Sequence, residues 1–476
     1  MTAQYAFLFD AKFCSGCKAC QAACKDKNNL PPGVLWRRVM EVAGGNWKKV
    51  GERWNNSVFA YNISISCNHC LHPKCAGICP VNAYVVREDG IVILDETKCI
   101  GCGYCAWGCP YGAPQYNPKT GHMTNCDFCF DSLEQGLPPA CVAACPLRVL
   151  DYGDMTALSA PTGNEIRLWD SPSEAHPHPL PVYSHTQPRL AIKKHPDMWV
   201  SEEKYMANKE EVQPRRPSSW DEAPLMLFTL LSQMAVGGMW VIAWMFPSLW
   251  ALMSVDTMVF RVLPLLLAGI CLGAGILISL AHLGTKKNVW RVLANLKRSS
   301  LSREALYMLL FGISVLFTIM AVLLHQDMTL CMALSVATGF GLVHHMAQVY
   351  RLPAAPGWNT RQTNAGFLIS ALLLGTSIMA PVLAYESAVS GIQVSGQRIT
   401  ISLLLITLLL AQLGLLLKES THHHIKQVRI ELLLIGIVFA GAIFFQLSFI
   451  WINAILLVVI LTEESLGRWL FYRSRI

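Results

Sequence analysis

The sequence predicts an α+β ferredoxin-like domain with four [4Fe–4S] clusters, followed by an all-α membrane domain of about eight transmembrane helices. Sixteen of the 18 cysteines lie between Cys14 and Cys145. Long apolar runs dominate the chain beyond about Asp221, and only 14% of all residues are charged, against about 25% in an average soluble domain. The region between them is rich in Pro and His without periodicity, which is typical of an extended linker. The expected division is therefore 1–170, 171–219 and 220–476.

The sixteen cysteines form four groups of four along the sequence. Two groups have the spacing C-x2-C-x2-C-x3-C, and a proline follows the last cysteine of three groups. In this pattern three thiolates hold one cubane cluster and the fourth reaches the neighbouring cluster. We therefore expect four ligand sets: Cys14, Cys17, Cys20 and Cys145 (set 1); Cys24, Cys126, Cys129 and Cys141 (set 2); Cys67, Cys70, Cys75 and Cys109 (set 3); and Cys79, Cys99, Cys102 and Cys105 (set 4).

Two other uses of cysteine compete with this interpretation. Cysteines two residues apart on a tight loop rarely meet the geometry of a disulfide. Zinc sites use two distant C-x2-C pairs rather than triplets followed by a fourth cysteine and a proline. The pattern thus favours clusters that relay electrons, because nothing beside them suggests a substrate pocket.

Alternating apolar residues predict short strands around the cysteine groups. Residues 4–10 and 59–66 each lead into a group, and residues 84–94 form a hairpin with a turn at Asp89–Gly90. Residues 112–125 are expected to form a turn-rich loop.

The apolar runs of the second half are long enough to cross a bilayer as helices. One apolar run, residues 430–466, is too long for a single helix and is expected to form two. Eight spans are therefore expected in all, with seven as the alternative. Loops on the side of the ferredoxin-like domain hold fourteen Lys and Arg, against Arg261 and Arg398 on the other side. The positive-inside rule therefore places the ferredoxin-like domain on the cytoplasmic side of the inner membrane. Basic residues that lie in such loops give little support for binding of nucleic acid.

Two ionisable residues frame the most basic loop, His282 at the end of one span and Glu304 at the start of the next. A polar group at the edge of a span is a functional candidate, and a histidine can accept a proton from a quinol hydroxyl. The alternative is a histidine solvated at the interface. His344 and His345 are adjacent, so they cannot both face one haem iron.

Several stretches resemble the dimethyl sulfoxide reductase family. The first 200 residues resemble its iron–sulfur subunit in QYAFLFDAKFCSGCKACQAACKD, VFAYNISISCNHC, CIGCGYCAWGCPYGAPQYN and GHMTNCDFC. From Trp220 on, WDEAPLMLFTLLSQMAVGG, LAHLGTKKNVWRVLANLKRSSLSREAL and ESLGRWLFY resemble its membrane anchor. The chain thus looks like a fusion of two subunits.

The resemblance implies a separate molybdopterin catalytic subunit docked on the ferredoxin-like domain, and menaquinol oxidation at the anchor. It implies that His282 (LAHLG) and Glu304 (SREAL) bind the quinol, that set 1 lies nearest the catalytic subunit, and that set 4 lies nearest the quinol. The catalytic subunit would reduce dimethyl sulfoxide or a similar S- or N-oxide. The family places its iron–sulfur subunit on the outer face, which conflicts with the loop charges.

Two other functions remain alternatives. Electrons could flow in reverse, from a dehydrogenase or polysulfide-type subunit into the quinone pool. The chain could also be a transporter with a redox sensor, but few charges lie in the spans and no broken-helix repeat is evident.

Overall fold

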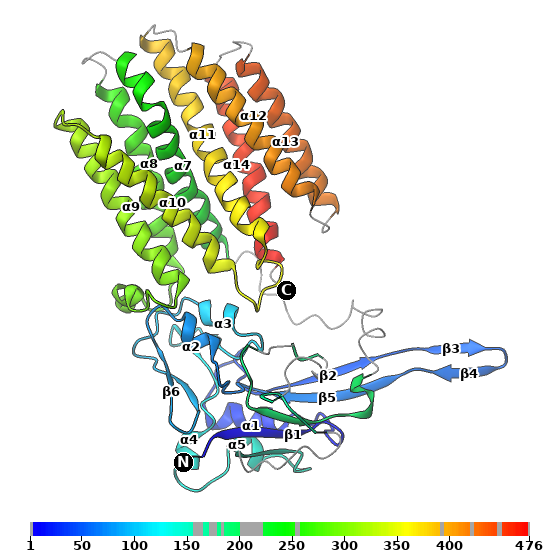
Figure 1. Ribbon diagram of the computed structural model, residues 1–476. Helices are drawn as coiled ribbons and strands as arrows, with labels where there is room; N and C mark the ends of the chain where they lie inside the picture. Colours follow the sequence, from blue (N-terminus) through cyan, green and yellow to red (C-terminus); the bar gives the residue numbers. More distant parts are fainter. Residues whose placement is uncertain are drawn as a thin grey trace. The chain divides into compact units, whose positions relative to one another are not determined.

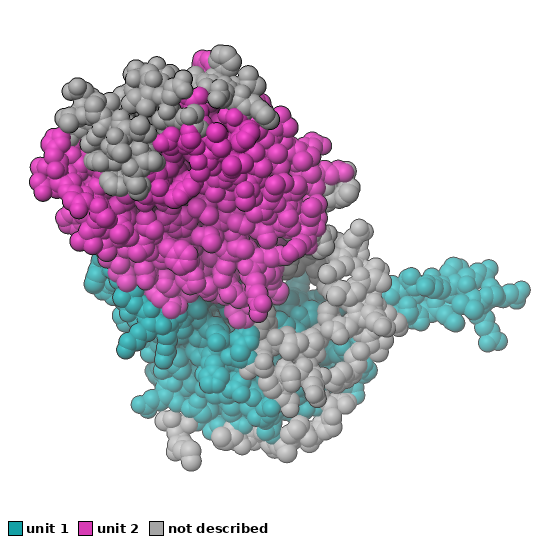
Figure 2. Space-filling view, turned by 45° about the horizontal axis from the view of Figure 1, so that its top comes forward, with its two compact units in different colours: residues 1–216, 283–299 teal, residues 217–282, 300–476 magenta. Residues whose placement is uncertain are grey.

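The computed structural model describes residues 3–155, 165–170, 179–181, 185–199, 222–252, 258–390, 395–418, 423–444 and 450–474. The chain divides into two compact units (Figure 2). The cysteine-rich unit contains Met1–Arg216 together with Leu283–Ser299, and the helical unit contains Pro217–His282 and Ser300–Ile476. The cysteine-rich unit therefore includes a segment, 283–299, that the sequence placed within the membrane domain 220–476.

The main sheet of the cysteine-rich unit has the strand order β10 (Leu150–Asp154), β1 (Tyr5–Asp10), β12 (Leu190–Lys193) and β11 (Glu165–Arg167). Strand β1 is antiparallel to β10 and parallel to β12, so that Phe7 pairs with both Tyr152 and Leu190. The apolar side chains of Leu190, Ala191 and Ile192 are buried in this position. Part of the expected linker 171–219 thus belongs to the cysteine-rich unit, because its strand fills the open edge of β1.

Four antiparallel pairs complete the strands of this unit. Pairs β2 (Arg38–Gly44) with β5 (Phe59–Ile65) and β3 (Trp47–Val50) with β4 (Arg53–Asn56) form the long arm in Figure 1. The predicted hairpin at 84–94 is confirmed as β6 (Tyr84–Val86) with β7 (Val92–Leu94). The expected loop 112–125 instead contains a short hairpin, β8 (Gln115–Asn117) with β9 (His122–Thr124).

Short helices carry or follow the cysteines. They are α1 (Ala19–Lys27), α2 (Lys74–Ile78), α3 (Tyr104–Gly108), α4 (Phe130–Leu133) and α5 (Ala140–Ala143), with the 3-10 helices η1 (Pro196–Trp199) and η3 (Lys286–Leu293). The core beside them is apolar and aromatic; Phe7 and Phe128 stack with ring centroids 4.1 Å apart. This core holds the cysteine loops in place.

The helical unit has eight long helices within the described residues. They are α7 (Ala223–Leu252), α8 (Met258–Ala281), α9 (Ser300–Leu323), α10 (Thr329–Tyr350), α11 (Arg361–Ser390), α12 (Ser395–Leu417), α13 (His423–Phe444) and α14 (Ile450–Arg473). The first seven are long and apolar enough to cross a membrane. Helix α14 is equally long but carries four residues of formal charge, Glu463, Glu464, Arg468 and Arg473. The apolar run 430–466 is divided between α13 and α14, and the turn expected near residues 445–449 lies outside the described residues.

The eight helices pack as two groups of four. Helices α7, α8, α9 and α10 contact one another in a ring, and helices α11, α12, α13 and α14 do the same (Figure 1). The main contact between the groups is α7 against α11, where the backbones approach closely at Gly237 and Gly375. Small residues permit such an approach between membrane helices.

Candidate functional site

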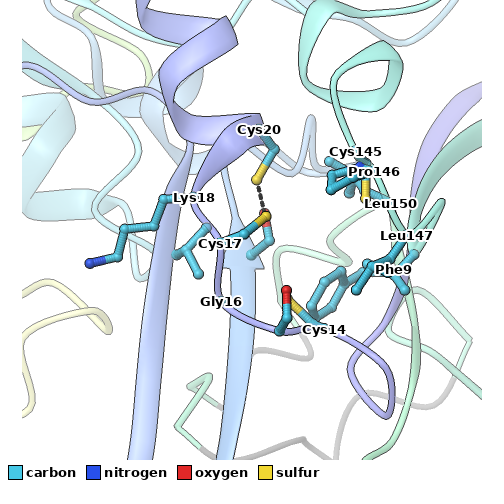
Figure 3. Close-up of a pocket in the computed structure, with 14 residues that line it drawn as sticks. Phe9, Cys14, Gly16, Cys17, Lys18, Cys20, Cys145, Pro146, Leu147 and Leu150 are labelled. Atoms are coloured by element: carbon cyan, nitrogen blue, oxygen red, sulfur yellow. Dashed lines mark hydrogen bonds between the residues drawn. The ribbon is translucent and has the colours of Figure 1, made fainter.

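The structure brings the four cysteines of set 1 together around one cavity. Cys14 and Cys17 lie on the loop that leads into α1, Cys20 lies in the first turn of α1, and Cys145 faces them from just after α5 (Figure 3). The empty space between these residues, which is partly open to solvent, is about 350 Å³. The Cys20 thiol also lies 3.4 Å from the Ser64 hydroxyl. Residues more than a hundred positions apart therefore converge on a single pocket.

Set 3 lines a second cavity of about 410 Å³. Cys67, Cys70 and Cys75 lie around α2, whereas Cys109 comes from the end of α3. The backbone N–H of Ala113 points at the Cys109 sulfur, with N and Sγ 3.5 Å apart.

The other two sets are also gathered. In set 2, Cys24 lies within electrostatic range of Cys141 and Cys129, and Cys126 lies within range of Cys24. In set 4, Cys105 lies within range of Cys102, Cys79 and Cys99. Backbone N–H groups of Gly101 and Met123 point at the Cys99 sulfur from 3.3 and 3.5 Å.

The four sets adjoin one another in a single order. Cys20 of set 1 neighbours Cys141 of set 2. Cys126 of set 2 neighbours Cys67 of set 3. Cys75 of set 3 neighbours Cys105 of set 4. This arrangement is a line of four sites, with sets 1 and 4 at its ends.

The geometry separates the alternatives for these cysteines. All 18 cysteines are free, so disulfides do not hold this unit together. Among the described residues, no three Cys, His, Asp or Glu side chains converge closely enough to bind a single metal ion. Four thiols spaced around a cavity instead fit a larger group such as a cubane cluster, whose irons each take one thiolate.

Burial governs the charge state of these thiols. It raises the pKa of Cys24 and of Cys67 to about 12. A buried thiol therefore needs a strong positive partner to become a thiolate, which bound iron supplies. The donor set thus fits iron–sulfur clusters chemically.

Sequence reasoning missed one residue of this site, Arg37. Its side chain is 2% exposed and donates to the hydroxyls of Ser64 and Ser66, at 3.2 and 2.8 Å. Burial alone would lower the pKa of Arg37, but Cys141, Cys126 and Cys20 offset this effect and the pKa stays above its ordinary value. A buried cation between sets 1 and 2 stabilises negative charge there. Its sequence signal was a basic pair, Arg37–Arg38, at the start of strand β2.

His282 and Glu304 lie where the sequence placed them, at the end of α8 and in the first turns of α9. The His282 imidazole is partly buried and its Nδ1 is shielded from solvent. Glu304 is 5% exposed, within electrostatic range of Tyr350 on α10 and Tyr472 on α14. The two tyrosine hydroxyls are hydrogen-bonded at 2.5 Å. Glu304 therefore faces the interior of the helical unit.

Among the other histidines of the helical unit, His345 stacks on Tyr307, with ring centroids 5.0 Å apart.

The expectation of few charges inside the spans is wrong for α14. Glu463 forms a buried ion pair with Arg429 of α13, with N–O distances of 2.7 and 2.9 Å. Glu464 accepts hydrogen bonds from Ser370 and Gln412, and Arg468 donates to Gln233 at 2.7 Å. These residues come from five helices, so hydropathy along the sequence could not reveal that they meet.

Comparison with known proteins agrees with this division of the chain. Residues 58–155 match the model of a 4Fe-4S dicluster domain, and residues 217–461 match that of the DMSO reductase anchor subunit. The chain is 46% identical over 214 residues to the B subunit of anaerobic dimethyl sulfoxide reductase of Escherichia coli, which covers 44% of this chain and all of that protein.

More distant relatives have other names. The thiosulfate reductase electron transfer subunit PhsB of Salmonella typhi is 36% identical over 178 residues, covering 37% of this chain and 86% of the relative. The formate dehydrogenase iron-sulfur subunit of Wolinella succinogenes is 37% identical over 180 residues, covering 33% of this chain and 84% of the relative.

Proposed function

The chain belongs to the dimethyl sulfoxide reductase family, as an iron–sulfur subunit and a membrane anchor in one polypeptide, and on this premise we propose that it oxidises menaquinol and relays the electrons to a separate catalytic subunit. The observation that carries the proposal is the line of four adjoining cysteine sets in a chain that also contains the anchor. A line of redox sites connects two reactions that occur at a distance.

Each of sets 1 to 4 is proposed to hold one [4Fe–4S] cluster. When bound, the clusters accept and pass single electrons, with potentials set by charge and hydrogen bonds around them. The chain's own contributions are the thiolates, the backbone N–H groups aimed at Cys99 and Cys109, and the Arg37 guanidinium between sets 1 and 2. Set 4 is proposed to receive electrons first, and set 1 to deliver them.

His282 and Glu304 are proposed to handle the protons of the quinol. Oxidation of one menaquinol releases two electrons and two protons. An imidazole at the end of a span can accept a proton from a quinol hydroxyl, and a buried carboxylate can take it onward. The hydrogen-bonded tyrosines near Glu304 support this role, because they provide a polar surrounding for a buried carboxylate.

The catalytic partner is proposed to be a molybdopterin subunit that reduces dimethyl sulfoxide or a similar S- or N-oxide, in line with the name of the Escherichia coli relative. The reverse direction is the second candidate, since a formate dehydrogenase subunit is also among the relatives. Redox titration decides between them. Cluster potentials above that of menaquinone favour quinol oxidation, and potentials well below it favour electron flow into the quinone pool.

The cysteine-rich unit is proposed to lie on the cytoplasmic side of the inner membrane. Two of the fourteen charges counted from the sequence, Arg429 and Arg468, are buried between helices. The remaining twelve still exceed the two on the other side. With eight helices, the C-terminus lies on the same side as the start of α7. A fluorescent reporter fused after Ile476 should therefore be active in the cytoplasm; activity of a periplasm-specific reporter at this position would reverse the assignment.

The central test replaces His282 by asparagine in the complete complex. This change should abolish turnover with menaquinol, while reduction by an artificial soluble donor that bypasses the quinol site stays intact. The matched control is His325→Asn, because His325 is an exposed histidine at the far end of α9. Unchanged menaquinol turnover in His282→Asn would remove His282 from the proposed site.

A further inference from the structure

The segment that joins α8 to α9 folds with the cysteine-rich unit rather than with the helices on either side of it. We call residues 283–299 the α8–α9 segment; it includes the 3-10 helix η3. Leu283 packs against the apolar cluster that contains Cys79, Cys99 and Cys105 of set 4. The segment is thus part of the wall around this set.

Two asparagines of the segment hydrogen-bond to the backbone of set 4 ligands. The Asn288 carboxamide donates to the carbonyl oxygens of Cys99, at 3.1 Å, and Thr97, at 2.8 Å. The Asn295 carboxamide donates to those of Cys79, at 2.9 Å, and Gly77, at 3.1 Å. Asn295 is 8% exposed. Each asparagine side chain therefore joins the carbonyl oxygen of a cysteine ligand to the carbonyl oxygen of a residue two positions earlier in the sequence.

Close backbone contacts fix the position of the α8–α9 segment against the residues around set 4. The Thr285 N–H donates to the Ile100 carbonyl at 3.1 Å, and the Asn82 carboxamide donates to the Ala294 carbonyl at 3.0 Å. A Cβ on Gly284 would lie 1.9 Å from the Gly121 carbonyl oxygen. Only glycine fits at position 284, so the contact depends on direct approach of the two backbones.

Sets 1 and 2 have hydrogen bonds of the same kind as those that Asn288 and Asn295 make to set 4. Sets 1 and 2 also have ligand carbonyls that accept from an asparagine carboxamide: Asn62 to Cys14 at 3.2 Å, Asn28 to Cys24 at 2.9 Å and Asn125 to Cys126 at 2.9 Å. Those three asparagines lie within the first 150 residues, close to the cysteines. For set 4 the corresponding donors come from the anchor half of the sequence.

We propose that Asn288 and Asn295 are positioning residues that complete the site of the set 4 cluster and set its reduction potential. This inference rests on the proposed function, since it presupposes a cluster at set 4. The two carboxamides fix the backbone at Cys79 and Cys99, where the N–H groups of Ala83 and Gly101 point at the cysteine sulfurs from 3.4 and 3.3 Å. Hydrogen bonds to the sulfurs would favour the reduced, more negative form of a cluster, so displacing this backbone should lower the potential. The segment is continuous in sequence with His282 at one end and with Ser300, four residues before Glu304, at the other.

The test uses Asn288→Leu and Asn295→Leu, singly and together, in the complete membrane complex. Leucine has nearly the same shape as asparagine but donates no hydrogen bond. Potentiometric titration followed by electron paramagnetic resonance should show a lower potential for one cluster of four, and the rate of cluster reduction by menaquinol should fall by about tenfold. The matched control, Asn62→Leu, should shift a different cluster and leave that one unchanged.

The outcomes separate this inference from the proposed function. Loss of the set 4 signal with three clusters retained would also support it, because the site would then be incomplete without the asparagines. Four unchanged potentials in the double variant would overturn the inference and leave the four-cluster relay standing. Fewer than four clusters in the unmodified protein would instead overturn the proposed function itself. If the double variant fails to assemble, the single variant Asn288→Ala, which removes the carboxamide donor without adding a larger side chain, provides the same measurement.

Discussion

The cysteine-rich unit and the helical unit assemble their functional groups in different ways. In the first, three of the four ligands in every set lie within sixteen residues of one another, as with Cys126, Cys129 and Cys141. In the second, buried polar groups meet only because different helices pack together, as with Arg429 and Glu463, 34 residues apart, or Arg468 and Gln233, 235 residues apart. Local spacing thus organises the redox sites, whereas helix packing organises the polar groups of the membrane domain.

The largest effect should come from breaking a ligand set. Cys145→Ser removes one thiolate from set 1, so the cluster there should be lost or altered, and menaquinol-driven electron transfer to the catalytic subunit should be abolished. Iron analysis and electron paramagnetic resonance should report the change in the set 1 cluster, with set 2 intact, although Cys145 and Cys141 are neighbours in sequence. The control is Cys271→Ser, a free cysteine in α8, which should retain all clusters. Loss of the set 2 cluster in Cys145→Ser would show that the ligands are shared differently.

The next effect concerns a buried charge in the helical unit. Glu463→Met removes the carboxylate that pairs with the buried Arg429 guanidinium at 2.7 Å, and this should cost about 3–5 kcal/mol of stability. The melting temperature in detergent, followed by size-exclusion chromatography after heating, should fall accordingly. The double variant Arg429→Met with Glu463→Met should recover much of the loss, because both members of the buried ion pair are replaced by apolar side chains.

A matched control for this pair exists in the cysteine-rich unit. Lys27 and Asp131 form an exposed ion pair, with side chains 29% and 50% accessible. Asp131→Asn should cost less than about 1 kcal/mol, because solvent screens the pair. Equal losses from Asp131→Asn and Glu463→Met would remove the contrast between the two units.

The same contrast explains what could be predicted from the sequence. The cysteine sets, the hairpin at 84–94 and the eight helices follow from spacing, alternation and hydropathy, all of which are local properties. Strand β12 was missed because its partner β1 lies about 180 residues earlier, and nothing near Leu190 indicates that pairing. Arg37 and Glu463 were missed for a related reason, since the sequence does not show whether a charged side chain is buried against another element or exposed to solvent. The α8–α9 segment was expected in the membrane domain because it lies between two apolar runs, whereas hydrogen bonds to Cys79 and Cys99 assign it to the other unit.

The smallest effect should come from the contact between the two groups of four helices. A Cβ on Gly237 of α7 would lie 1.7 Å from the Ala371 carbonyl oxygen of α11. Gly237→Ala should therefore force the helices apart and cost about 1–3 kcal/mol. A Cβ on Gly269 of α8 would meet no atom within 4 Å, so Gly269→Ala should be neutral or should stabilise its helix by up to about 1 kcal/mol. Melting temperatures of the two variants in detergent measure the difference directly. A lower melting temperature for Gly237→Ala and a higher one for Gly269→Ala would mean that long-range packing determines the effect of a substitution in this unit. A similar small rise in both melting temperatures would mean that intrinsic helix propensity determines it. The helical unit would then follow the same local rules as the cysteine loops.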